Sequence, residues 1–170
     1  MNDYVRDFFT FLSDHNYYTT KEEQVKHLYE QFVGYIDALA YEVQRDLKDG
    51  EIFEPKFIKH LINLQSQLEE GRLPNESMVD MTLDNFVSHC EEGINLTMSE
   101  IKKLSKQEID KNVVADILYS VFCCRIWIAN CTGLVFAGYG DEDIYPSIYS
   151  YQTHCVIDGK LSYAHLTAED

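Results

Sequence analysis

The stretch LVFAGYGDEDIYPSIYSYQTHCVIDGKLSYAHL, residues 134–166, decides the fold class of this chain. Short apolar runs alternate with turn-forming residues, which is the pattern of strands joined by tight turns. We predict strands over 134–140, 147–157 and 160–166, with the Asp-Gly pair at 158–159 as a two-residue hairpin turn. The first run is almost continuously apolar, so we expect that strand to be buried on both faces. The residues that mark this pattern are Gly133, Gly138, Tyr139, Gly140, Pro146, Asp158 and Gly159.

Helical periodicity fills the chain before this stretch. We predict helices over 2–14, 20–48, 55–71, a short one from 82 onward, and one from 105 onward. Two of them open with capping-box patterns, Thr20–Glu23 and Ser105–Glu108, in which side chains bond the first free amides. The apolar stripe of the first helix is expected at Tyr4, Phe8, Phe11 and Leu12. The core face of the second is expected at Val25, Leu28, Tyr29, Phe32, Tyr35, Ile36, Leu39, Val43 and Leu47.

Helices followed by an antiparallel meander are typical of the α+β class. With 170 residues, of which 45% are hydrophobic, the chain is long enough for one domain with a real core. We interpret residues 1–170 as a single domain, mainly helical over 1–130 and a three-stranded β-meander over 131–170. One helical layer cannot cover both faces of a sheet, so we expect the domain to be incomplete.

The net charge of -15 restricts the partners of this chain. Residues 1–100 carry 8 basic and 20 acidic groups, whereas residues 101–170 carry 6 and 9. A field of this sign repels phosphates, so we expect neither nucleic acid nor an anionic membrane as a partner. A basic protein surface, or solubility alone, fits the charge better.

The cellular compartment is predicted from the start of the chain and from its cysteines. The start, MNDYVRDFF, does not have the pattern of a secretory signal, and no apolar run reaches the ~20 residues that span a bilayer. The nearest run is interrupted by Asp116, Arg125 and Asn130. The five cysteines, with one adjacent pair, indicate reduced thiols in a cytoplasmic protein.

Few residue patterns in the chain predict chemistry. The pairs His89–Cys90 and His154–Cys155 are adjacent, so their side chains diverge and favour buried thiols over a metal site. The Gly-Tyr-Gly at 138–140 is followed by acidic residues that would repel a pyrophosphate. We therefore predict no metal and no cofactor. A free-standing cysteine hydrolase that uses Cys155 or Cys131 with a histidine stays an alternative.

The motif at residues 133–161, GLVFAGYGDEDIYPSIYSYQTHCVIDGKL, resembles the central segment of proteasome β-subunit-like proteins of the N-terminal-nucleophile (Ntn) hydrolase superfamily. The likeness is greatest to a bacterial group of uncharacterised proteasome-like proteins, in which a helix similar to DYVRDFFTFL (Asp3 to Leu12) follows the first sheet. The resemblance implies part of an αββα sandwich whose intact relatives hydrolyse amide bonds. Their nucleophile is an N-terminal Thr, Ser or Cys ahead of the helices, and no residue here matches it.

Two functional hypotheses follow. In the first, the chain is a fragment or inactive piece of a proteasome-like Ntn hydrolase. Unpaired strand edges at 134–139 or 161–166 would then lead it to self-associate or to bind the missing N-terminal half. In the second, it is an acidic helical protein-binding module without enzymatic activity, whose partner is a basic protein.

Overall fold

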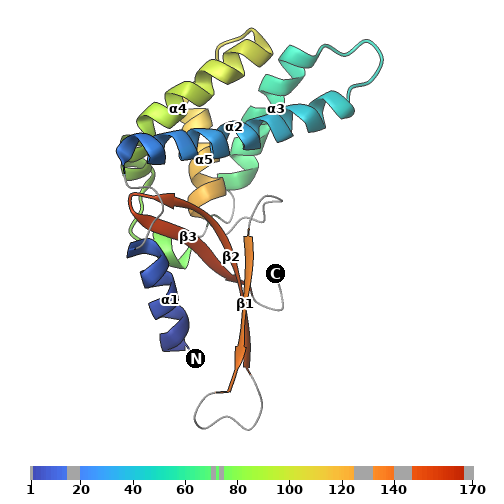
Figure 1. The fold of residues 1–170 in the computed structure, drawn as a ribbon. Helices are drawn as coiled ribbons and strands as arrows, with labels where there is room; N and C mark the ends of the chain where they lie inside the picture. Colours follow the sequence, from blue (N-terminus) through green and yellow to red (C-terminus); the bar gives the residue numbers. More distant parts are fainter. Residues whose placement is uncertain are drawn as a thin grey trace.

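The computed structural model of the chain describes residues 2–14, 20–69, 72, 75–124, 132–139 and 147–166. Its elements are α1 (Asn2–Asp14), α2 (Lys21–Arg45), α3 (Phe53–Glu69), the 3-10 helix η1 (Glu76–Met78), α4 (Leu83–Ser105), α5 (Lys111–Cys123), β1 (Thr132–Gly138), β2 (Ser147–Ile157) and β3 (Lys160–Leu166). Helices come first and an antiparallel sheet comes last, which confirms the α+β class. Helices α2 to α5 gather at one end of the sheet, and α1 lies beside it (Figure 1).

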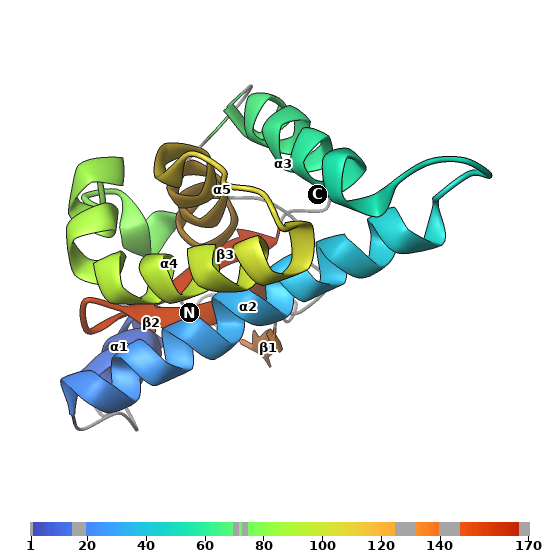
Figure 2. The ribbon, with the colours of Figure 1, turned by 90° about the horizontal axis from the view of Figure 1, so that it is seen from above.

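The four helices α2 to α5 form a bundle with one continuous hydrophobic core. Seen from above, α2 and α4 run side by side, and α5 lies between α4 and α3 (Figure 2). Phe32 of α2 is fully buried, and its ring lies 6.0 Å from that of Phe86 and 5.1 Å from that of Phe122. Gly93 of α4 lies against the same ring, where a Cβ would meet the Phe32 side chain at 3.5 Å, an ordinary van der Waals contact.

The sheet is a meander with the order β1-β2-β3. Leu134 of β1 lies opposite Tyr151 of β2, and β2 pairs with β3 through a register shift between Thr153 and Val156. Asp158 and Gly159 form the β2–β3 turn with φ values of 51° and 71°. Two positive φ angles in a two-residue loop are typical of a type I′ hairpin, so the predicted turn is confirmed.

Helix α1 covers one face of the sheet and forms a second, smaller core with it. Val5 and Phe9 are buried against Tyr151, and the Phe9 ring stacks on Tyr163 with centroids 3.9 Å apart. Phe8 meets the edge of the Phe136 ring at 5.3 Å. The expected stripe was therefore partly wrong. Tyr4 and Phe11 are exposed, and the packed face is Val5, Phe8, Phe9 and Leu12.

A buried polar junction ties the bundle to the sheet. The Asn75 amide Nδ2 donates to Ser162 Oγ at 2.8 Å, and that hydroxyl donates to the Phe122 carbonyl oxygen at 2.6 Å. The backbone N–H of Tyr163 donates to Ser77 Oγ at 3.0 Å. Part of the outer edge of β3 is therefore held by η1.

The helix boundaries confirm some sequence predictions and correct others. The capping box of α2 is present, with Thr20 and Glu23 exchanging hydrogen bonds. The expected core face of α2 is confirmed in part. Its buried members are Leu28, Phe32, Ile36, Leu39 and Val43, whereas Val25, Tyr29 and Tyr35 are half-buried and Leu47 lies beyond the end of the helix. The helix ends at Arg45 instead of Lys48, and the predicted third helix begins at Phe53, so that Pro55 lies in its first turn.

The region around Ser105 was predicted wrongly. The expected short helix after Thr82 is the 23-residue α4, which continues through Ser105. The Ser105 hydroxyl donates to the Ile101 carbonyl within α4 and does not cap the next helix. The cap of α5 is Asp110, whose carboxylate accepts from the Asn112 N–H at 2.9 Å. The reason is that the αL residue Lys106 ends α4 first, which leaves residues 107–110 as a connector.

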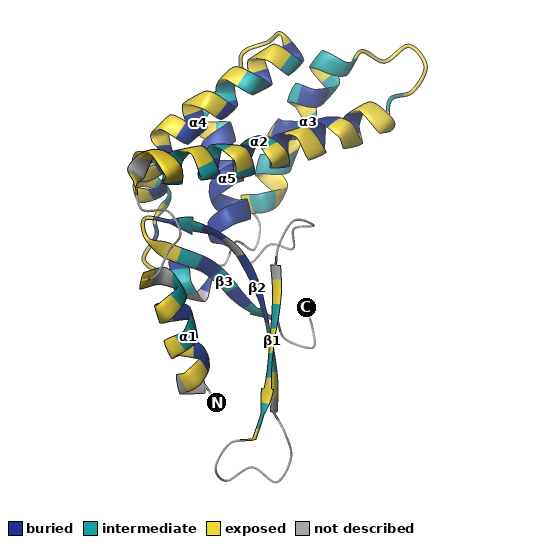
Figure 3. Cartoon of the chain, in the orientation of Figure 1, coloured by how far each residue is buried: buried dark blue, intermediate teal, exposed yellow. Residues whose placement is uncertain are grey.

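The expectation that the first strand is buried on both faces is also wrong. Val135 is 68% exposed, and Ala137 is exposed as well. Leu134 and Phe136, on the opposite face, are half-buried under α1. β2 and β3 are mostly buried toward the bundle, whereas exposed and half-buried residues alternate along β1 (Figure 3). The apolar run therefore belongs to a strand with one open face.

Candidate functional site

The residues that mark the strand pattern do not converge on one site. Gly133 and Gly138 lie in β1, and Tyr139 directly follows it. Gly138 pairs with the first residue of the 11-residue strand β2, whereas Asp158 and Gly159 follow its last residue. At the usual rise per residue, Gly138 and this turn are roughly 30 Å apart. Gly140 and Pro146 lie outside the described residues. These residues shape the sheet and do not assemble a catalytic centre.

The most unusual surface of the described chain is apolar and lies on the sheet. Val135, Tyr139 and Ile148 are 68%, 69% and 68% exposed, and the exposed Ala137 lies directly opposite Ile148. Alternation along β1 places Val135 and Ala137 on the side opposite Leu134 and Phe136, which pack under α1, and Tyr139 directly after the strand is also exposed. We call Val135, Ala137, Tyr139 and Ile148 the outer sheet patch. Exposed apolar clusters of this kind mark interaction sites on proteins.

The two strand segments that carry the outer sheet patch contain no charged residue. Residues 132–139 and 147–153 contain no Asp, Glu, Lys, Arg or His, although the whole chain has a net charge of -15. Among the described strands, β1 pairs only with β2, so the other edge of β1 has no strand partner there. An uncharged edge strand beside an open apolar face is prone to pair with another strand.

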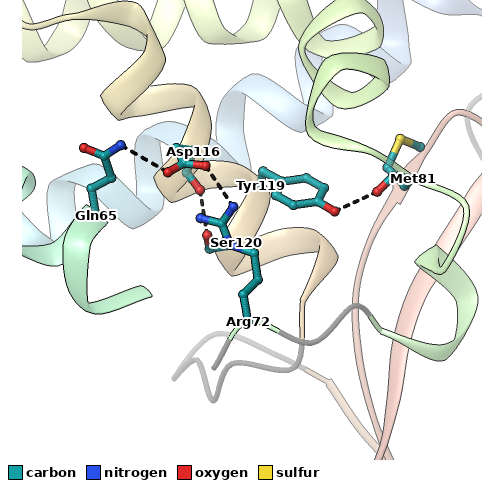
Figure 4. A network of polar contacts seen from close by, with 6 residues as sticks. All are labelled: Gln65, Arg72, Met81, Asp116, Tyr119 and Ser120. Atoms are coloured by element: carbon teal, nitrogen blue, oxygen red, sulfur yellow. Dashed lines mark hydrogen bonds and ion pairs between the residues drawn. The ribbon is translucent and has the colours of Figure 1, made fainter. Parts of the chain in front are cut away.

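A partly buried ion pair forms the centre of a polar cluster in the bundle (Figure 4). Arg72 Nη1 donates to Asp116 Oδ1 at 2.9 Å, and Gln65 Nε2 donates to Asp116 Oδ2 at 3.1 Å. The Arg72 guanidinium lies 5.4 Å from the centre of the Tyr119 ring, and Tyr119 donates to the Met81 carbonyl. Burial by itself raises the pKa of Asp116, but the hydrogen bonds from Arg72 and Gln65 outweigh it and lower that pKa.

The Arg72 cluster is enclosed, which determines what it can do. Nε and Nη2 of Arg72 are buried, and they have no hydrogen-bond partner in the part of the chain that the structure describes. These two N–H groups are a guanidinium edge suited to a carboxylate, but solvent does not reach them. We therefore interpret the cluster as an anchor that fastens Arg72 onto α5.

Four of the five cysteines lie in the core, and none of the four is an activated nucleophile. Cys90, Cys123, Cys124 and Cys155 are free and buried. Burial raises the pKa of Cys90 to about 12 and that of Cys124 to about 11. It also raises the pKa of Cys123 and of Cys155, the proposed nucleophile. Cys131, the other proposed nucleophile, lies outside the described residues.

We expect these four thiols to react slowly in the folded protein. Because the thiolate is the nucleophile, raised pKa values and burial should slow alkylation by iodoacetamide at pH 8 on the order of a hundredfold relative to free cysteine. Peptide mass spectrometry of timed samples measures this rate for each residue. The unfolded protein in urea provides the control and should be labelled fast at every cysteine. A fast label on native Cys155 would revive the cysteine-hydrolase alternative.

His89 holds α4 to the sheet and is not free to act as a general base. Its Nε2 lies 3.1 Å from Asp158 Oδ1 in the β2–β3 turn, and its Nδ1 lies 2.7 Å from the Asn85 carbonyl oxygen. Both ring nitrogens are thus engaged. A groove of about 470 Å³ beside His89 is lined partly by Glu91 and Glu92. The two carboxylates on its wall would repel a developing oxyanion.

A second groove, of about 530 Å³, lies between the end of α2 and the start of α3. Lys56, Lys59 and His60 line it beside Glu42, Asp46 and Glu51, and the Lys56 ammonium is bound to the Asp46 carbonyl and the Glu51 carboxylate. Within the described residues, no group of three or more His, Cys, Asp or Glu side chains is placed to hold a metal ion. None of the described helices is long and apolar enough to cross a bilayer.

Comparison with protein families, with curated proteins and with solved structures finds no match for this chain. Its class is therefore defined by its own geometry. It is an α+β protein in which a helical bundle caps one end of a three-stranded meander and a separate helix covers one face of that meander.

Sequence reasoning missed two features that matter here. Asp116 was noted only as an interruption of an apolar run, and Arg72 was not singled out. A charged residue inside an apolar helix requires a buried partner, and that signal points to an ion pair. The outer sheet patch was missed because a continuous apolar run does not reveal which of its faces is covered.

Proposed function

We propose that this chain is a non-catalytic protein-binding domain that binds through the outer sheet patch. One observation carries the proposal. Helix α1 packs on one face of the sheet, whereas Val135, Ala137, Tyr139 and Ile148, the outer sheet patch, are exposed to solvent. The enclosed Arg72 cluster, the high thiol pKa values and the doubly engaged His89 support binding over catalysis.

The test compares three tagged proteins in extracts of the native cells. These are the wild type, Val135→Lys, and the matched control Val79→Lys. Val79 lies directly after η1, away from the patch in the sequence, and is 66% exposed. A lysine in the patch places an ammonium against an apolar partner, so we expect capture of that partner to fall at least about tenfold. Quantitative mass spectrometry measures the captured proteins, a second copy of this chain included.

Val79→Lys should retain that partner, and circular dichroism should show both variants folded. Equal capture by all three proteins would contradict the proposed function. Equal capture would instead favour binding of a basic protein to the acidic surface of the helices, and that binding should weaken as the salt concentration is raised.

A second candidate function is part of an Ntn-type amide hydrolase, as the resemblance implies. What supports it is the local layering, a helix on one face of a meander and an open opposite face, where a sandwich of that class has its second sheet. The mass of the natural gene product tests it. A product heavier than 19.8 kDa that begins with Thr, Ser or Cys would support this candidate, and a product of 19.8 kDa would contradict it.

A further inference from the structure

We propose that His89 is a proton-dependent clamp between α4 and the β2–β3 turn, whose ring hydrogen-bonds both of its partners only as the imidazolium. The hold of the bundle on this turn then weakens as the pH rises through neutrality. The inference is independent of the proposed function, because it concerns an internal contact between α4 and the turn and not the outer sheet patch.

Both groups that His89 contacts are hydrogen-bond acceptors. Nδ1 lies 2.7 Å from the carbonyl oxygen of Asn85, four residues earlier on α4, and Nε2 lies 3.1 Å from Asp158 Oδ1 in the turn. A carbonyl oxygen and an ionised carboxylate have no hydrogen to donate. For both contacts to be hydrogen bonds, each ring nitrogen must carry a hydrogen. A ring with two N–H groups is the positively charged imidazolium.

The neutral ring cannot keep both contacts. It carries one N–H and one lone pair, so the nitrogen that loses its hydrogen faces an oxygen lone pair with a lone pair of its own. Asn85 and His89 lie on the same helix, and its backbone holds them together. Asp158 belongs to a turn that is distant in the sequence, so it is the partner that moves away when the ring loses its proton.

The charges beside the ring favour its positive form. In the groove next to His89 the other titratable side chains are Glu91 and Glu92 of α4, and α2 contributes the apolar Val25. Lys111 of α5 offsets part of this negative charge, since its Nζ lies 3.1 Å from Glu91 Oε1. Glu92 and Asp158 then remain as the carboxylates that attract a proton to the ring.

The clamp acts on the turn and not on the whole sheet. Cys155 and Ile157, just ahead of the turn, are buried in the core of the bundle and stay there whatever the charge of His89. Cys90 does not compete for the proton. Burial, and after it the charge of Asp158, raises the pKa of its thiol to about 12. Opening of the clamp should therefore loosen the turn locally while the fold persists.

The charge of the ring is the first test. Proton–nitrogen correlation spectra show how many hydrogens each imidazole ring carries, and the His89 signals are those that are missing from His89→Gln. At pH 7 we expect His89 to be mostly doubly protonated in the wild type. Asp158→Asn supplies an amide that can donate to Nε2, so in that variant the ring should be mostly neutral at pH 7. A ring that is mostly neutral at pH 7 in both proteins overturns the clamp.

Deuterium exchange then measures the hold on the turn itself. After correction for the intrinsic effect of pH on exchange, the amides of residues 157–160 should open at least about threefold more often at pH 8 than at pH 6 in the wild type. The direction follows because the clamped state holds a proton that the opened state releases, so a rise in pH favours opening. Histidine changes its charge within this range, between about pH 5 and 8.

The variants separate the clamp from a merely structural contact. His89→Gln and Asp158→Asn should lose the pH dependence of opening, whereas the control His60→Gln, on α3 in the other groove, should keep it. Turn amides that open equally often at pH 6 and pH 8 in the wild type overturn the clamp, even if a variant fails to fold. The same pH dependence in the wild type and in His89→Gln also overturns it.

Discussion

Replacing Phe32 with alanine should lower the free energy of unfolding by about 3–5 kcal/mol, the usual cost of removing a buried phenylalanine ring. The ring is 0% exposed and contacts Phe86, Phe122 and the backbone at Gly93, so α2, α4 and α5 all lose packing at once. Because small domains have a total stability of about 5–15 kcal/mol, this single change should bring the bundle close to unfolding. Urea unfolding followed by circular dichroism measures the shift in midpoint.

Tyr41→Ala is the matched control, since Tyr41 lies on the same helix and is 69% exposed. Its midpoint should stay close to that of the wild type, because truncating an exposed side chain leaves no cavity. Equal midpoints for Phe32→Ala and the wild type would show that α2 does not pack against α4 and α5 as described.

Replacing Asp116 with alanine should lower the free energy of unfolding by about 3–5 kcal/mol, because it leaves the guanidinium of Arg72 without its counter-ion. Gln65 loses its acceptor in the same step. Asp46→Ala removes the exposed pair with Arg45, at the similar distance of 3.0 Å, and should leave the unfolding midpoint nearly unchanged. The same urea titration compares the two variants.

The Arg72→Met and Asp116→Leu double variant should recover most of the stability that Asp116→Ala loses. Two packed apolar side chains leave no buried charge without a partner, whereas Asp116→Ala leaves the Arg72 guanidinium unpaired. A double variant no more stable than Asp116→Ala would contradict an anchoring role and indicate that each side chain has a separate task.

The contribution of Asp116 to the stability of the folded protein should decrease as the pH is lowered. Its pKa in the folded protein is lowered below the ordinary value of 3.8, so the folded state holds the proton less tightly than the unfolded state. Its stabilising effect is complete above the unfolded pKa and is lost as the pH falls through the folded pKa. The difference between the wild type and Asp116→Ala should therefore be constant near pH 7 and shrink below about pH 4.

Local signals predicted the elements of this fold well, and tertiary contacts decided the rest. The Asp158–Gly159 turn and the Thr20 capping box follow from residue chemistry within four positions, and both are present. Ser105 matched a capping box equally well, yet α4 continues through it. A capping-box pattern does not show whether the preceding helix has already ended. One of the two capping-box predictions was therefore wrong.

The candidate interface could be predicted only in part. The sequence indicated unpaired strand edges at 134–139 or 161–166. Among the described strands one edge of β1 has no strand partner, whereas η1 holds part of the outer edge of β3. The exposure of Val135 depends on where α1 and the bundle lie, which involves residues more than 100 positions away. No local pattern contains that information.

The most direct test of the outer sheet patch as an interface is hydrogen–deuterium exchange on the protein isolated in its native assembly. The reference is the Val135→Lys chain measured under the same conditions. We predict slower exchange in the native assembly at residues 132–138, whatever the partner is, with little change across α2 and α4. Unchanged exchange at 132–138 together with new protection on the helices would contradict the account and place the interface on the acidic bundle.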